Sequence, residues 1–229
     1  MAKNYFKFRQ FLIRQDRSAM KVGTDGVLLG VWARGGNRIL DIGSGTGLLA
    51  LMMAQRFHTA QVIGVEIDHD SAEQARENVI ASGFLDVEIV EADIRCFREG
   101  EFDAIICNPP YFIDSLECPD RQRTLARHTS SLSYRELMTS VSLLLSDNGE
   151  FSVIVPSNSK SVIEQEALLV GLFKVRQCAV KTTPRKPPRR YLIAFRRHPA
   201  LVEQTEGVIE EQPNERSVWY KELTKEFYL

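Results

Sequence analysis

The residues with the clearest chemical potential are Asn108-Pro109-Pro110-Tyr111, which follow the apolar run 102–107. Such a run is typical of a buried strand. Two prolines remove N–H donors and fix φ, so the strand would end in a rigid lip with carbonyl acceptors, an amide and an aromatic ring. This combination suits a planar group that bears an NH2, such as the adenine amine. A plain Pro-Pro turn in which Tyr111 only packs is the alternative, and the rest of the chain must decide between them.

A glycine-rich turn stands upstream, where Asp41-Ile42-Gly43-Ser44-Gly45-Thr46-Gly47 precedes a helical pattern at 48–56. Glycines let the backbone turn sharply and approach a ligand closely, although many nucleotide-binding folds share this device. The spacing is G-x-G-x-G, and an acid precedes it. A negative charge there favours a ligand with a sulfonium and an amino group over a pyrophosphate. We therefore expect Asp41, Gly43 and Gly45 to bind such a ligand.

Acids also stand at the ends of the next two predicted strands. Glu66 is placed to accept hydrogen bonds from both hydroxyls of a ribose, with Asp68 as the second choice. Asp93 could accept from an adenine amine, and Ile67 and Ile94 could sandwich the ring. Each acid alone could equally be a helix cap or lie in a solvated loop. Acids at three successive strand ends behind a glycine turn predict a nucleoside site.

These residues need a sheet whose strand ends meet. From Arg38 onward, short apolar runs alternate with helical patterns, which indicates βαβ units with helices on both faces. The last two strand segments follow one another without a helix, so we expect them to form an antiparallel hairpin. The prediction is an α/β fold with a mostly parallel seven-stranded sheet that ends in this hairpin. Strands are expected at 39–42, 62–66, 87–90, 103–107, 151–155, 173–180 and 191–197.

Short patterns mark three expected helix starts. Ser133 with Glu136 forms a capping box, Ser161 with Glu164 repeats it, and Asp70 with Glu73 does so more loosely.

Composition is that of an ordinary globular protein. The 229 residues are 44% apolar with a net charge of −1, and no apolar run approaches the roughly 20 residues that span a bilayer. Four scattered cysteines without a C-x-x-C pair favour reduced thiols in a cytoplasmic protein and no metal site. We expect a single domain over 1–229, with an N-terminal arm and helix (1–37), a core (38–197) and a partly helical extension (198–229).

One stretch has a strong local charge. Residues 181–197 contain several cations and no acid, and the first 21 residues are also basic. Such asymmetry can give a neutral protein a basic face that binds a polyanion, although a solvated loop is the simpler interpretation. The expected binding residues are Lys181, Arg185, Lys186, Arg189 and Arg190, helped by Lys3, Lys7, Arg9 and Arg14.

Residues 20–197 resemble the class I S-adenosylmethionine (SAM) methyltransferases, through Asp-x-Gly-x-Gly-x-Gly, Gly-Val-Glu-Ile-Asp, Ala-Asp-Ile and Asn-Pro-Pro-Tyr. The last motif is similar to that of the amino-methyltransferases in this class. Further segments resemble the bacterial tRNA1(Val) adenine-N6 methyltransferases: residues 21–32, Arg127-His128, Thr183-Pro184-Arg185 and Phe227-Tyr228-Leu229. The resemblance implies SAM as the cofactor and adenine 37, in the anticodon stem-loop of a tRNA, as the acceptor.

The resemblance also implies roles for single residues. Asn108 and the Pro109 carbonyl would accept both N–H groups of the adenine amine, and Tyr111 would stack on the base, worth about 1–3 kcal/mol. Asn108 would border the cofactor as well, and Pro110 would keep the lip rigid. Asp25 would lie over the methionine end of SAM, although capping the helix that follows is an equally good role. The basic stretch would bind the tRNA backbone of a monomeric enzyme.

Other acceptors share this chemistry. Asn-Pro-Pro-Tyr also serves enzymes that methylate protein glutamine or bases in rRNA and DNA. The glutamine enzymes usually carry a helical N-terminal domain and the DNA enzymes a recognition domain, and neither is expected here. A small-molecule enzyme would not need the basic stretch. A non-catalytic SAM- or RNA-binding protein would not need an intact Asn108-Pro109-Pro110-Tyr111.

Overall fold

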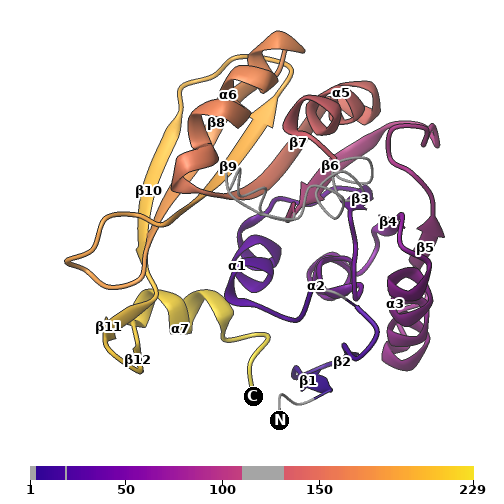
Figure 1. The fold of residues 1–229 in the computed structure, drawn as a ribbon, viewed down its shortest axis with the longest axis horizontal. Helices are drawn as coiled ribbons and strands as arrows, with labels where there is room; N and C mark the ends of the chain where they lie inside the picture. Colours follow the sequence, from indigo (N-terminus) through magenta and orange to yellow (C-terminus); the bar gives the residue numbers. More distant parts are fainter. Residues whose placement is uncertain (1–3, 19, 110–131) are drawn as a thin grey trace, which may run out of the picture.

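An eight-stranded sheet runs through the computed structural model, which describes residues 4–18, 20–109 and 132–229 (Figure 1). The strand order is β10-β8-β9-β7-β6-β3-β4-β5. The strands are β3 (Arg38–Ile42), β4 (Gln61–Glu66), β5 (Val87–Glu91), β6 (Phe102–Cys107), β7 (Leu145–Pro156), β8 (Phe173–Lys181), β9 (Arg190–Arg196) and β10 (Glu203–Val208).

The sheet confirms the predicted topology and adds one strand to it. β5, β4, β3, β6 and β7 pair in parallel, and β9 is antiparallel to both β7 and β8. The expectation of seven strands was wrong because β10, from the C-terminal extension, pairs in parallel with β8. Its sequence, Glu-Gln-Thr-Glu-Gly-Val, is polar and mostly exposed at the sheet edge. It therefore lacks the apolar run that marks the other strands.

Helices cover both faces of the sheet, as predicted (Figure 1). Ile39 and Ile106 pack in one core with α1, α2 and α3, whereas Leu40 and Ile105 pack in a second core with α5 and α6. The alternation follows from the two-residue repeat of a strand, which sends neighbouring side chains to opposite faces. The helices are α1 (Thr24–Trp32), α2 (Leu48–Arg56), α3 (His69–Ser82), α5 (Tyr134–Leu144), α6 (Lys160–Leu169) and α7 (Val218–Thr224). Two small hairpins, β1 (Tyr5–Lys7) with β2 (Leu12–Arg14) and β11 (Glu210–Gln212) with β12 (Glu215–Arg216), lie near the termini.

One of the three predicted helix starts is confirmed. Ser133 and Glu136 form a reciprocal capping box at α5. The box predicted at Ser161 was wrong, because α6 begins at Lys160 without a side-chain cap and Glu164 pairs instead with Lys160 and Lys174. The start predicted at Asp70 was also wrong. Asp68 caps α3 by accepting from the Ser71 amide at 2.9 Å.

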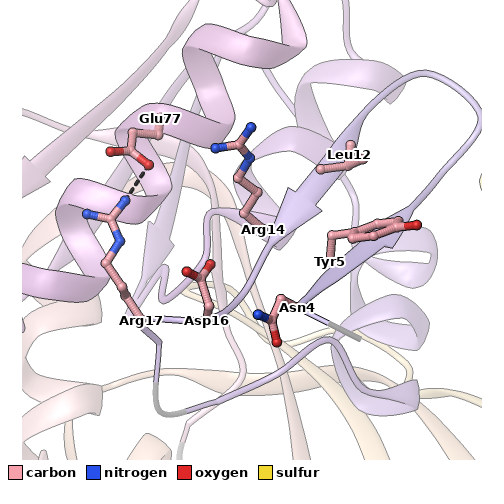
Figure 2. Close-up of a pocket in the computed structure, with 7 residues that line it drawn as sticks. All are labelled: Asn4, Tyr5, Leu12, Arg14, Asp16, Arg17 and Glu77. Atoms are coloured by element: carbon pink, nitrogen blue, oxygen red, sulfur yellow. Dashed lines mark hydrogen bonds and ion pairs between the residues drawn. The ribbon is translucent and has the colours of Figure 1, made fainter. Parts of the chain in front are cut away.

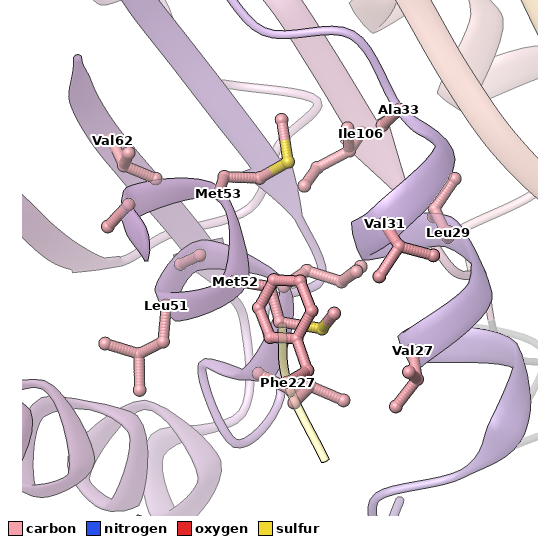
Figure 3. Packing of buried hydrophobic residues seen from close by; sticks show 14 of the residues in the cluster. Val27, Leu29, Val31, Ala33, Leu51, Met52, Met53, Val62, Ile106 and Phe227 are labelled. Atoms are coloured by element: carbon pink, nitrogen blue, oxygen red, sulfur yellow. The ribbon is translucent and has the colours of Figure 1, made fainter. Parts of the chain in front are cut away.

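The C-terminal extension reaches back into the core. Phe227 is 2% exposed and packs beside Met52 and Val27, between α2 and α1 (Figure 3). The Gln55 side chain of α2 donates to the Glu226 carbonyl at 2.9 Å. The extension is partly helical, as expected, through α7. Among the described ranges, no helix is both long and apolar enough to cross a bilayer.

Candidate active site

A cavity of about 730 Å³ opens where β3, β4, β5 and β6 end. The carboxyl ends of parallel strands share one edge, and ligands of open α/β sheets bind there. Asp25 and Asp41 are not part of its wall. The predicted residues that do form the wall are Gly43, Gly45, Glu66, Ile67, Asp93, Ile94, Asn108 and Pro109.

The glycine turn is left-handed at each glycine. Gly43, Gly45 and Gly47 have φ values of 71°, 54° and 78°, which side chains rarely tolerate. A Cβ added to Gly43 would have no described atom within 4 Å, so the space beside the turn is open to a ligand. The Gly43 and Ser44 amides donate to the Val65 carbonyl at 2.8 and 3.1 Å, which fixes the turn against β4.

Asp41 lies behind this turn. It is fully buried, and its Oδ2 accepts from the Ala50 amide at 3.1 Å, which anchors the first turn of α2. Burial raises the pKa of Asp41 to about 8, and the nearby charge of Glu66 acts in the same direction. Asp41 therefore supports the site indirectly, because it holds the start of α2, which follows the glycine turn.

Glu66 ties the turn to the end of β4. Its Oε2 accepts from the Gly45 amide at 2.8 Å, and its Oε1 accepts from the Ile67 and Asp68 amides at 2.9 Å. These bonds fix the orientation of a carboxylate that borders the cavity. Asp68, the second choice for the same role, is the cap of α3.

Arg95 is a residue of the site that sequence reasoning missed. Its guanidinium donates to both carboxylate oxygens of Asp93, at 2.6 to 2.9 Å, and holds the pKa of that carboxyl below its usual range. Arg95 also pairs with Glu136 at 3.2 Å. The available signal was the Asp-x-Arg spacing, since the Arg95 amide donates to Asp93 in a local turn at 2.9 Å.

Two isoleucines line the cavity with different exposure. Ile67 is 52% exposed, whereas Ile94 is buried at 6%. Ile67 therefore presents an exposed apolar surface beside the cavity, and the pairing of both side chains around a planar ring stays a prediction.

Asn108 stands at the end of β6 with an unused acceptor. Its Oδ1 is buried and has no hydrogen-bond partner among the described residues. Its Nδ2 approaches Met20 Sδ at 3.8 Å. Met20 also lines the cavity and was missed from the sequence. Pro110, Tyr111 and the Arg127-His128 segment lie outside the described residues.

The basic stretch lies at the same edge of the sheet as the cavity. Arg190 begins β9 and pairs in register with Pro156, at the end of β7. Arg185, Lys186 and Arg189 are exposed, in the connection between β8 and β9.

Acids from distant segments neutralise two of the predicted cations. Lys181 pairs with Glu206 at 2.8 Å, and Arg190 pairs with Asp25. Burial raises the pKa of Asp25, and Arg190 opposes that shift. Local sequence shows no acid near this stretch, because Asp25 and Glu206 reach it only through the fold.

One predicted cation of the N-terminal arm is held by the C-terminal end of the chain. Arg9 donates to the Tyr228 carbonyl at 2.6 Å. A hollow of about 530 Å³ lies between β2 and α3, where Arg17 pairs with Glu77 beside Arg14 (Figure 2). Lys3 lies outside the described residues. Over the described ranges, no group of three or more His, Cys, Asp or Glu side chains is arranged to hold a metal ion.

Comparison with known proteins agrees with this geometry. Residues 20–181 match the methyltransferase small domain. The chain is 45% identical over 234 aligned positions to a tRNA1(Val) (adenine(37)-N6)-methyltransferase from Bacteroides thetaiotaomicron, covering 100% of this chain and 99% of that protein.

Two solved structures share the fold. A predicted O-methyltransferase from Agrobacterium tumefaciens has a TM-score of 0.65 at 20% identity, over 89% of this chain and 96% of that one. A TehB-like SAM-dependent methyltransferase from Corynebacterium glutamicum has a TM-score of 0.53 at 16% identity, over 77% and 89%. These two structures show the shared fold, and the domain match with the full-length relative shows that the chain belongs to the SAM-dependent methyltransferases, in the tRNA1(Val) (adenine(37)-N6)-methyltransferase family.

Proposed function

We propose that the protein transfers a methyl group from SAM to N6 of adenine 37 in the anticodon loop of tRNA1(Val). The observation that carries the proposal is at Asn108, which lines the cavity and whose buried Oδ1 atom has no described hydrogen-bond partner. A buried acceptor of this kind costs free energy unless a ligand satisfies it. An amine N–H at this position would do so.

The cavity fits the cofactor by its donor set. The open space at Gly43 would accept the amino-acid part of the cofactor, and the carboxylate of Glu66 would accept from the ribose hydroxyls. Ile67 and Ile94 would enclose the adenine, with Asp93 near its edge. When bound, SAM supplies a methyl group on an electron-poor sulfur, so the donor needs no further activation.

The residues at the end of β6 would therefore act on the acceptor. The adenine amine is a poor nucleophile because its lone pair is delocalised into the ring. Hydrogen bonds from its two N–H groups to Asn108 Oδ1 and the Pro109 carbonyl would favour a pyramidal nitrogen and stabilise its growing positive charge. With the amine held in this way, its lone pair would be free to take the methyl group, and the electrons of the broken bond would remain on the sulfur. The proton that the nitrogen then loses passes to water.

The connection between β8 and β9, residues 182–189, would hold the RNA, and we call it the basic connection. Arg185, Lys186 and Arg189 are exposed beside the edge of the sheet where the cavity opens. Phosphate contacts there would supply affinity, while the cavity selects the base. Lys181 and Arg190 are weaker candidates because each already pairs with an acid. The target base must leave its stack, which costs less in a loop than in a duplex.

A transfer assay tests the proposal. Wild-type protein is incubated with radiolabelled SAM and a tRNA1(Val) transcript, a transcript with guanine at position 37, or duplex DNA. We expect label only in the first. Equal labelling of the guanine transcript would place the reaction elsewhere on the RNA, and preferred labelling of DNA would overturn the RNA assignment. The proposal extends to a monomer working in the cytoplasm, where tRNA resides, and sedimentation would test the oligomeric state.

A further inference from the structure

An ion pair between Asp25 and Arg190 joins the first turn of α1 to the start of β9. The Asp25 side chain is 13% exposed and that of Arg190 is 33% exposed, so neither is a freely solvated charge. Neither residue forms part of the cavity wall, whereas Gly23 and Gly26 on either side of Asp25 do. The ion pair therefore holds the first turn of α1 on the side away from the cavity, whereas Gly23 and Gly26 of the same region border the cavity.

That turn lines the same cavity as the acceptor residue Asn108. A Cβ built at Gly26 would stand 3.0 Å from Leu48 Cδ2 and 3.8 Å from Asn108 Nδ2. Gly26 therefore faces the Asn108 amide across a gap that one methyl group would fill, so the position of α1 limits the space beside that amide. Within the part of the chain that the structure describes, Asn108 Nδ2 donates to Met20 Sδ over a long distance of 3.8 Å.

The other member of the pair, Arg190, directly follows the connection between β8 and β9, residues 182–189. The Arg189 amide donates to the Val180 carbonyl at 3.0 Å, and the Ser157 amide donates to the Arg189 carbonyl at 3.1 Å. The Ser157 hydroxyl also donates to the Pro188 carbonyl at 2.5 Å. The end of the connection is therefore bound to β8 and to the end of β7, and Arg190 follows it directly.

We propose that Arg190 is a positioning residue: its pair with Asp25 holds the first turn of α1 beside Asn108 at a fixed place relative to the basic connection. The inference rests on the proposed function, since the connection is taken to hold tRNA. The inference gives the neighbouring residues Arg189 and Arg190 different roles. Arg189 would contribute phosphate binding, and Arg190 would contribute the geometry of the acceptor amide.

The test compares steady-state transfer to tRNA1(Val) for Arg190→Ala, Asp25→Asn, the double variant and Arg189→Ala. We expect each Arg190 or Asp25 variant to lower kcat about tenfold, with the salt dependence of tRNA binding unchanged. The double variant should fall no further than the single ones, because both remove the same interaction. Arg190→Lys should recover part of kcat. Arg189→Ala should instead raise KM for tRNA and flatten its salt dependence.

Three results would overturn the inference. Arg190→Ala could behave like Arg189→Ala, the two single effects could multiply in the double variant, or Arg190→Lys could be as impaired as Arg190→Ala. If Arg190→Ala fails to fold in thermal unfolding, the comparison is made with Arg190→Lys and Asp25→Glu, which keep both charges and alter the geometry. Wild-type transfer is measured first, so its absence would count against the proposed function, and its presence leaves the variants to test the pair.

Discussion

The Gly45 amide and the Glu66 carboxylate are joined by a hydrogen bond of 2.8 Å, so the glycine turn after β3 and the acid that ends β4 form one unit. The two motifs are separate in the sequence, and each would be ambiguous alone. Their contact gives a turn with open space beside it and a carboxylate with a fixed orientation. Cofactor binding should therefore be sensitive to changes at either member.

Glu66→Ala should weaken SAM binding by about 1–3 kcal/mol, the cost of leaving buried polar partners unpaired. The loss has two sources, the ribose contacts and the hydrogen bond that holds the Gly45 amide. Titration calorimetry measures it, with Glu88→Ala, an exposed acid on β5, as the control. Equal SAM affinity in wild type and Glu66→Ala would remove Glu66 from the site.

Asp41→Asn should change how stability depends on pH. Burial raises the folded-state pKa of Asp41 to about 8 from an ordinary value of 3.8, so the folded state binds this proton more tightly than the unfolded chain. Its contribution to stability is complete below about pH 4 and is lost as the pH rises towards 8. Asparagine can still accept from the Ala50 amide and does not titrate.

Urea unfolding of wild type and Asp41→Asn at pH 5 and pH 8, without SAM, checks this pH dependence of stability. The stability of Asp41→Asn relative to wild type should increase from the lower to the higher pH. An identical difference at both pH values would show that the Asp41 carboxyl does not titrate in this range.

Phe227→Ala should destabilise the fold by about 3–5 kcal/mol, the usual cost of removing a buried phenyl group. Urea unfolding measures the loss of stability. Leu229 lies two residues away and is 79% exposed, so Leu229→Ala should leave stability nearly unchanged. We propose that the whole chain is one domain, so a single transition should report both core and extension. A separate early transition that alone responds to Phe227→Ala would contradict this.

Replacing Arg185, Lys186 and Arg189 with alanine should weaken tRNA binding and flatten its salt dependence. Each lost phosphate contact should reduce the slope of log affinity against log salt by about 0.7–0.9. Binding is measured at several salt concentrations for the triple variant and for each single alanine replacement, and Arg98→Ala is the charge-matched control for the single replacements. Arg98 is exposed and precedes Glu99, whose carbonyl accepts from Arg38 at the start of β3, on the opposite edge. Parallel lines of equal affinity for wild type and triple variant would exclude this surface.

The sequence predicted the elements that carry an apolar repeat and the motifs at their ends. The α2 bounds and the β8–β9 hairpin were predicted because their patterns are local. β10 was missed because an edge strand can be polar, and the Ser161 box was wrong because tertiary pairing of Glu164 with Lys174 outweighed a local pattern.

In the site too, residues marked by a local pattern were predicted, and residues placed by tertiary contacts were missed. Glu66 ends β4 and Asn108 follows β6, and both were found from that position, together with the residues around them. Arg95 and Met20 were missed because a side chain that packs onto a neighbour leaves no periodic signal. The pairing of Asp25 with Arg190 could not be foreseen, since only the fold brings α1 beside β9.

The most direct test of the account is the turnover of Asn108→Ala on tRNA1(Val), measured beside its SAM affinity. Asn108 is proposed to act on the acceptor amine in the transition state, so kcat should fall by at least about 100-fold. SAM affinity and thermal unfolding should change little. Asn158→Ala, an exposed asparagine after the neighbouring strand β7, is the matched control and should keep wild-type turnover. Turnover of Asn108→Ala within a fewfold of wild type would contradict the proposed acceptor mechanism.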